Sequence, residues 1–132
     1  MARILVADDE PHARRVLELR LIGAGHDVTL ASDGLEALET LREGAFDVLV
    51  TDICMPRMTG RELIDALRSL DAPFPIVFVL TSKVEDEFRD WLRDYDDLAF
   101  MEKPVSLRQL IAEIEQRLSD RKAEDADPEP SV

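Results

Sequence analysis

The chain has 132 residues, a length typical of a single domain, and 45% of them are hydrophobic while 34% are charged. Its formal net charge of −13 argues against direct binding to nucleic acid or to an anionic membrane surface. The single cysteine, Cys54, excludes a disulfide bond within the chain, and no apolar stretch approaches the roughly 18 residues of a membrane span. We therefore expect a globular protein of the reducing cytoplasm.

Five short apolar segments alternate with five amphipathic segments along the chain. The apolar segments cover residues 4–7, 28–31, 46–50, 76–80 and 99–101. Several are continuous runs, which is typical of strands covered on both faces. The amphipathic segments lie within residues 11–24, 34–41, 59–70, 88–95 and 106–118. This alternation predicts an α/β protein with a flavodoxin-like, doubly wound, five-stranded parallel sheet of order 2-1-3-4-5 and five helices.

The last 14 residues differ in composition from the rest of the chain. Residues 123–130 are acidic, show no hydrophobic periodicity and offer almost nothing to bury. Such segments do not bury enough apolar surface to offset the entropy of ordering. We therefore predict one domain over residues 1–118, followed by a disordered acidic tail or a truncated linker over residues 119–132.

The predicted strands 1, 3, 4 and 5 all end in polar residues. These are Asp8 and Asp9, Thr51 and Asp52, Thr81 and Ser82, and Glu102 and Lys103. In the predicted order the four strands are neighbours, and ligands of doubly wound sheets bind beyond the carboxyl ends of the strands. Carboxylates gathered there repel one another, by about 4 kcal/mol for unit charges roughly 4 Å apart at an effective dielectric constant near 20. A hard cation such as Mg²⁺ relieves this repulsion and binds carboxylates, waters and phosphate oxygens, so the pattern predicts a site for a metal ion and a phosphoryl group.

Together these residues resemble the receiver domain of bacterial two-component signalling, in a chemotaxis-regulator-like form. The resemblance covers about residues 3–118 and rests on Asp8 and Asp9, on Asp52 with Met55, Pro56 and Gly60 after it, on Thr81, and on Lys103 with Pro104. Each piece is common by itself, but their order and their positions at strand ends are specific. The resemblance implies a phosphoacceptor response regulator of a two-component system or phosphorelay. Such a domain catalyses only its own phosphorylation and dephosphorylation, so we do not expect an enzyme.

The resemblance also implies a role for each residue of the pocket. Asp52 is the expected phosphoacceptor, and its donor is the phosphohistidine of a sensor histidine kinase or of a histidine phosphotransfer protein. The expected Mg²⁺ ligands are Asp8, Asp9, Asp52 and the backbone carbonyl of Cys54. Lys103 is expected to pair with the carboxylate before transfer and with phosphoryl oxygens afterwards, and its bond to the following proline is expected to be cis.

The resemblance further implies a conformational switch. Thr81 is expected to move and hydrogen-bond a phosphoryl oxygen, and Phe100 is expected to turn inward as it moves. The resulting change would alter the face formed by the fourth helix, the fifth strand and the fifth helix, where a downstream effector protein binds. Phosphorylation-dependent dimerisation is an open alternative. Lys83, two residues after Thr81, is a candidate for tuning the lifetime of the phosphorylated state.

Simpler roles exist for each of these residues taken singly. Either aspartate of the first pair suits a helix N-cap, and Thr81 suits a strand end. Lys103 suits a solvated surface, Phe100 a core, and Cys54 a small half-buried position. The order and spacing of the whole set favour the phosphorylation site over these separate readings.

Two other functions fit parts of the pattern. A phospho-aspartyl hydrolase also uses strand-end aspartates and Mg²⁺, but it would need a second acid two residues after the nucleophile, where this chain has Cys54. A nucleotide or flavin carrier of the same fold would need a glycine-rich first loop, and residues 8–11 contain no glycine. Both functions are therefore disfavoured.

The first predicted helix departs from an ideal amphipathic pattern. Arg20 stands where an apolar residue is usual, while Leu19 and Ile22 fall outside the buried stripe. Two explanations are open: the helix is slightly rotated, or the two apolar residues form a docking patch for the kinase.

Overall fold

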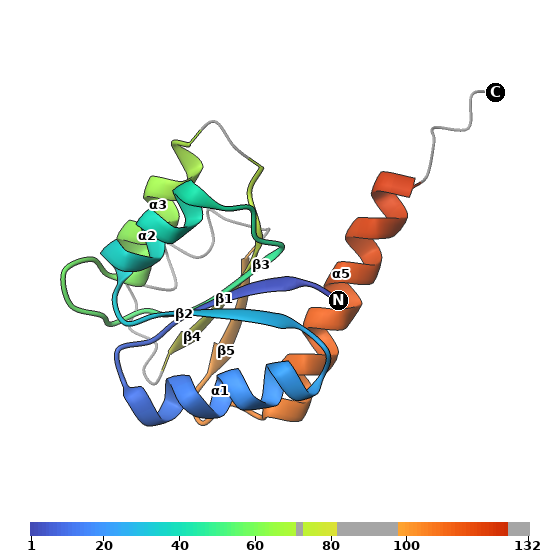
Figure 1. Ribbon diagram of the computed structural model, residues 1–132, viewed down its shortest axis with the longest axis horizontal. Helices are drawn as coiled ribbons and strands as arrows, with labels where there is room; N and C mark the ends of the chain where they lie inside the picture. Colours follow the sequence, from blue (N-terminus) through green and yellow to red (C-terminus); the bar gives the residue numbers. More distant parts are fainter. Residues whose placement is uncertain (71–72, 82–97, 127–132) are drawn as a thin grey trace.

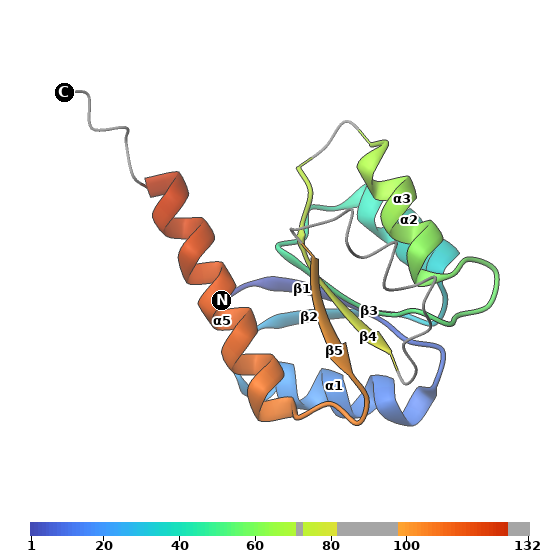
Figure 2. The ribbon, with the colours of Figure 1, turned by 180° about the vertical axis from the view of Figure 1, so that it is seen from behind.

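A five-stranded parallel sheet lies at the centre of the protein, with helices on both of its faces (Figures 1 and 2). The computed structural model describes residues 1–70, 73–81 and 98–126. The strands are β1 (Arg3–Ala7), β2 (Asp27–Ala31), β3 (Val48–Asp52), β4 (Ile76–Thr81) and β5 (Leu98–Glu102). Their order is β2-β1-β3-β4-β5, and every neighbouring pair is parallel. The predicted fold class and strand order are confirmed.

Four helices belong to the described part of the chain. They are α1 (Pro11–Gly23), α2 (Gly34–Glu43), α3 (Gly60–Arg68) and α5 (Leu107–Ala126). The helix expected within residues 88–95 lies outside the described residues, as does Lys83. None of the described helices combines the length and the apolar character needed to cross a membrane.

The sheet separates two hydrophobic clusters, because successive side chains of a strand point to opposite faces. On one face Ile4 and Val6 pack with α1 and α5. On the other face Leu5 and Ala7 pack with α2 and α3. All four of these β1 residues are fully buried. Burial on both faces explains the continuous apolar runs of the sequence and leaves the ends of the strands as the place for polar chemistry.

Helix α1 is not rotated relative to its predicted apolar stripe. Leu17 and Leu21 are buried against the sheet, as the stripe requires. Arg20 is exposed. Leu19 and Ile22 remain 53% and 50% exposed. The rotated-helix explanation is therefore wrong, and the two apolar side chains face solvent.

Helix α5 extends beyond residue 118, into the segment predicted to be either a disordered acidic tail or a truncated linker. The helix continues to Ala126, and its C-terminal turns extend away from the sheet (Figures 1 and 2). No glycine or proline interrupts residues 107–126, and the stretch is rich in good helix formers such as alanine, arginine, lysine and glutamate. A hydrogen bond from Gln116 Nε2 to Asp120 Oδ1, 3.0 Å long, also supports the helical spacing. The hydrophobic pattern of the sequence did not predict the last turns of α5, because these turns have no apolar stripe.

The position of the domain boundary remains a prediction, and truncation tests it. A chain that ends at Leu118 should unfold cooperatively and lose less than about 1 kcal/mol of stability, because residues 119–122 are exposed and surface changes are usually small. Thermal unfolding of the truncated chain and of the 132-residue chain measures the difference. Loss of cooperative unfolding in the truncated chain would show that the domain extends beyond residue 118.

Candidate functional site

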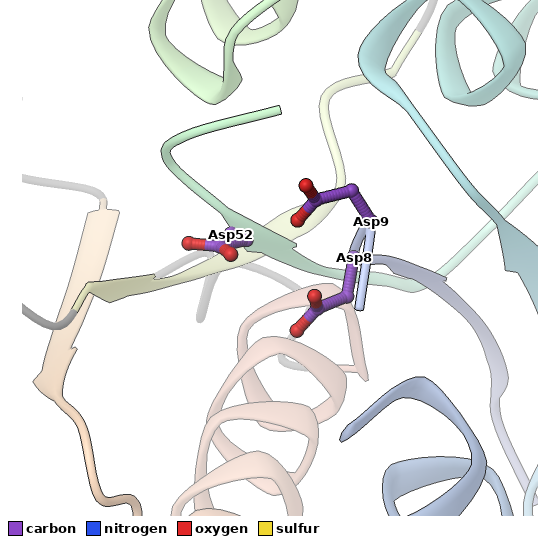
Figure 3. Close-up of side chains that lie close together, drawn as sticks. All are labelled: Asp8, Asp9 and Asp52. Atoms are coloured by element: carbon purple, nitrogen blue, oxygen red, sulfur yellow. The ribbon is translucent and has the colours of Figure 1, made fainter. Parts of the chain in front are cut away.

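Three carboxylates gather at the carboxyl edge of the sheet (Figure 3). Asp8 and Asp9 follow β1, and Asp52 ends β3. These strands are neighbours, and Ala7 lies opposite Thr51 in their register, so each strand delivers its next residue to the same place. One oxygen from each carboxylate lies within 4.8 Å of the others. Asp8 is 1% exposed, while Asp9 is exposed, so the cluster has a closed inner side and an open outer side.

Lys103 supplies positive charge to this cluster. Its Nζ lies 3.1 Å from Asp52 Oδ2 and 3.5 Å from Asp8 Oδ2. The lysine directly follows β5, and its backbone N–H donates to the carbonyl oxygen of Thr81 at 2.6 Å. The peptide bond between Lys103 and Pro104 is cis, as the resemblance implied. Lys103, which follows β5, thus contacts two other predicted site residues, Asp8 after β1 and Asp52 at the end of β3.

The charges of the pocket do not balance. Burial raises the pKa of Asp8, and the Asp52 charge adds to this effect against the opposing Glu10 N–H and Lys103. Burial alone would lower the pKa of Lys103, but Asp52 first and Asp8 second outweigh it and raise that pKa. The cluster contains three carboxylates. Within the described part of the chain, the ion pairs to it come from a single ammonium group, that of Lys103. An all-oxygen donor set with surplus negative charge fits a hard divalent cation such as Mg²⁺.

The backbone around Asp52 is held by several short-range contacts. Its Oδ1 accepts the Ile53 N–H at 2.7 Å, and the Thr51 hydroxyl donates to its carbonyl oxygen at 2.9 Å. Gly60 N–H donates to Ile53 O at 2.9 Å. A Cβ at Gly60 would collide with the carbonyl oxygen of Asp52, so this close return of the chain requires glycine. Cys54 is exposed within the loop that these contacts close.

Thr81 and Phe100 lie on the adjacent strands β4 and β5. Thr81 ends β4 and is 3% exposed. Phe100 is half-buried, lies opposite Val79 and precedes Lys103 by three residues. The backbone hydrogen bond from Lys103 to Thr81 therefore links one of the two expected switch residues to the lysine that contacts the carboxylate cluster.

Two further residues near the cluster were not found from the sequence. Glu10 is the N-cap of α1, and its carboxylate accepts the N–H groups of His12 at 3.0 Å and Ala13 at 2.6 Å. These hydrogen bonds lower the pKa of Glu10. Because Glu10 fills the capping position, the simpler role of Asp8 or Asp9 as the cap of α1 is wrong. Arg14 Nη1 donates a hydrogen bond to the Asp8 carbonyl oxygen at 2.8 Å. The position of Glu10 directly before the helix could have indicated its role as the N-cap. Nothing in the sequence indicated the contact of Arg14 with Asp8.

Comparison with known proteins identifies the family of the chain. The sequence model of the response regulator receiver domain matches residues 4–115. The chain belongs to the response regulator receiver domain family.

Relatives of this receiver domain include the response regulator MprA of Mycobacterium ulcerans, which is 38% identical over 98% of the chain and 56% of that relative. The MprA protein of Mycobacterium leprae is 38% identical over 94% of the chain and 54% of that relative. The receiver domain therefore spans just over half the length of these curated relatives.

Solved structures of other receiver domains resemble this one in fold. The chemotaxis response regulator CheY4 of Vibrio cholerae is 30% identical, has a TM-score of 0.79, and aligns over 88% of this chain and 98% of its own. A CheY-like receiver domain from Methanospirillum hungatei is 26% identical, has a TM-score of 0.87, and aligns over 94% of this chain and 98% of its own. The two-component assignment of the chain thus agrees with sequence and fold comparisons alike.

Substitution of Asp8 by asparagine tests the charge imbalance. Because the folded pKa of Asp8 is raised, the folded state loses stability relative to the unfolded state as pH rises from the unfolded value, near 3.9, through the raised value. Asp8→Asn should therefore stabilise the metal-free protein at pH 7. The gain should shrink toward pH 4.

Calorimetric unfolding in EDTA measures this difference. Glu39→Gln, which neutralises an exposed acid on α2, is the matched control for the change in total charge. If Asp8→Asn is less stable than the wild type at pH 7, or gains no more than the control, the imbalance is not a source of instability.

Proposed function

We propose that this receiver domain accepts a phosphoryl group on Asp52 from the phosphohistidine of a histidine kinase or of a histidine phosphotransfer protein. An Asp52 carboxylate oxygen forms a bond to phosphorus as the bond from phosphorus to the histidine nitrogen breaks. The products are an aspartyl phosphate and a free imidazole. The observation that carries the proposal is the cluster of Asp8, Asp9 and Asp52 with Lys103 Nζ 3.1 Å from the acceptor carboxylate.

The proposed metal is Mg²⁺, held by the carboxylates of Asp8, Asp9 and Asp52 and by the backbone carbonyl of Cys54. When bound, Mg²⁺ neutralises charge on the oxygens of the transferring phosphoryl group. The oxygen-only donor set and the raised pKa of buried Asp8 support this choice.

Lys103 acts before and after phosphoryl transfer, whereas Thr81 and Phe100 respond to the phosphorylated state. Lys103 orients the Asp52 carboxylate before transfer and pairs with phosphoryl oxygens after it. The Thr81 hydroxyl donates a hydrogen bond to a phosphoryl oxygen, and Phe100 turns inward as Thr81 moves. The two states differ in these contacts, so phosphorylation shifts the equilibrium between them.

The proposed output is protein binding. A downstream effector recognises the face that includes β5 and α5 and the helix expected within residues 88–95, or phosphorylation leads to a dimer. The acidic charge of −13 supports a protein partner over nucleic acid. A cytoplasmic location and the absence of enzymatic action on other substrates complete the proposal.

Acetyl phosphate tests the acceptor directly. After incubation with acetyl phosphate and Mg²⁺, the wild-type chain should gain one phosphoryl group by intact mass, because this small donor needs no docking partner. Asp52→Asn should gain none, since an amide oxygen does not form a stable acyl phosphate. Asp47→Asn, a carboxylate before β3 that binds the Arg3 backbone N–H at 2.8 Å, should behave as the wild type. An adduct that persists in Asp52→Asn would contradict the assignment.

The exposed apolar residues of α1 suggest where the donor docks. Leu19→Glu should slow phosphotransfer from the cognate kinase at least tenfold, because a charge at the centre of an interface must be desolvated. Leu19 is 53% exposed, so folding should be unaffected. The same variant should be phosphorylated by acetyl phosphate at the wild-type rate, which serves as the internal control. Unchanged transfer from the kinase would remove Leu19 from the docking surface.

A further inference from the structure

An ion pair joins the loop after β3 to the loop before α2. Arg57 lies in the β3–α3 loop, five residues after Asp52. Its Nε and Nη2 lie 2.9 Å and 2.8 Å from Asp33 Oδ2. Among the described residues, Arg57 is the one non-glycine residue with a positive φ, at 66°. That conformation is uncommon for side chains other than asparagine and aspartate, and it persists where surrounding contacts hold it.

Asp33 is a rigid anchor for this arginine. It is 7% exposed, and its other oxygen, Oδ1, accepts the Glu36 N–H at 2.8 Å as the N-cap of α2. Burial opposes ionisation of Asp33, but the Glu36 N–H and the Arg57 guanidinium outweigh burial and lower its pKa. Both carboxylate oxygens are therefore engaged, and the charge that Arg57 meets is fixed in place.

The β3–α3 loop also rests directly on the start of α2. A Cβ at Gly34 would collide with the backbone carbonyl of Met58, so the two segments touch at their backbones. The loop is anchored at its far end by the capping box of Thr59 and Glu62 at the start of α3. Met55 is buried in the core. The ion pair adds an anchor between these points, close to the exposed Cys54.

We propose that Arg57, through Asp33, is a positioning residue for the proposed metal site. This inference rests on the proposed function, in which the Cys54 carbonyl is a Mg²⁺ ligand. A backbone carbonyl binds a metal more tightly when the loop already holds it in the binding orientation, because less entropy is lost on binding. The ion pair restrains the loop three residues from Cys54. Outer contacts of this kind commonly change metal affinity by about 10- to 100-fold.

A purely electrostatic role predicts the opposite sign for one of two variants. If the two side chains act only through charge, Arg57→Met removes a positive charge and tightens Mg²⁺ binding, while Asp33→Asn removes a negative charge and weakens it. If they position the loop, both variants weaken binding. Asparagine is as good an N-cap as aspartate, so Asp33→Asn keeps the cap of α2 while removing the ion pair.

The experiment is calorimetric titration of Mg²⁺ into the metal-free 132-residue chain. Arg57→Met and Asp33→Asn should each raise the Kd by about tenfold. The double variant, which has the wild-type net charge, should raise it no further than either single variant, because both substitutions break the same contact. Arg15→Met, which breaks the α1 pair with Glu18 at 2.6 Å, should stay within twofold of the wild type.

Thermal unfolding in EDTA accompanies each titration. A merely structural pair would lower the unfolding temperature of the variants but leave the Kd for Mg²⁺ unchanged, and that result overturns the inference. Opposite shifts for the two single variants also overturn it, in favour of a charge effect. If Arg57→Met does not fold, Arg57→Gln, which also removes the positive charge, takes its place beside Asp33→Asn under the same criteria. Absence of Mg²⁺ binding by the wild type itself would instead refute the proposed metal, and the inference with it.

Discussion

The constraint on which the site depends is the gathering of like charges at one edge of a parallel sheet. The register of β1 against β3 places Asp8 beside Asp52, and β5 delivers Lys103 to both. Burial on both faces of the sheet excludes solvent from the inner side of this cluster, which raises the pKa of Asp8. The fold therefore creates a local surplus of negative charge at this edge of the sheet, and the proposed metal site depends on that surplus.

Neighbouring contacts keep this unfavourable cluster in place. Glu10 takes over the capping of α1, which leaves both preceding aspartates available to the pocket. Arg14 holds the carbonyl of Asp8 from the same helix. The backbone of Gly60 approaches the carbonyl of Asp52 closely enough to exclude a side chain. Local hydrogen bonding and close packing thus offset the repulsion among the three carboxylates.

Sequence reasoning succeeded where the signal was periodic or fell at strand ends. Continuous apolar runs predicted the sheet, and polar residues directly after them predicted Asp8, Asp52 and Lys103 as one cluster. It failed where partners lie far apart in the chain without a pattern, since nothing in the sequence relates Arg57 to Asp33, 24 residues away. It also failed at the end of α5, whose last turns extend beyond the apolar stripe that sequence patterns detect.

That extension of α5 has a mechanical consequence. The helix packs against the sheet through side chains from Leu107 to Leu118, with Leu110 and Ile114 fully buried, whereas residues 119–122 are exposed. At 1.5 Å per residue a helix of 20 residues is about 30 Å long, so a tilt of about 10° at its base displaces its far end by about 5 Å. A small change in the tilt of α5 would therefore produce a larger displacement at its C-terminal end.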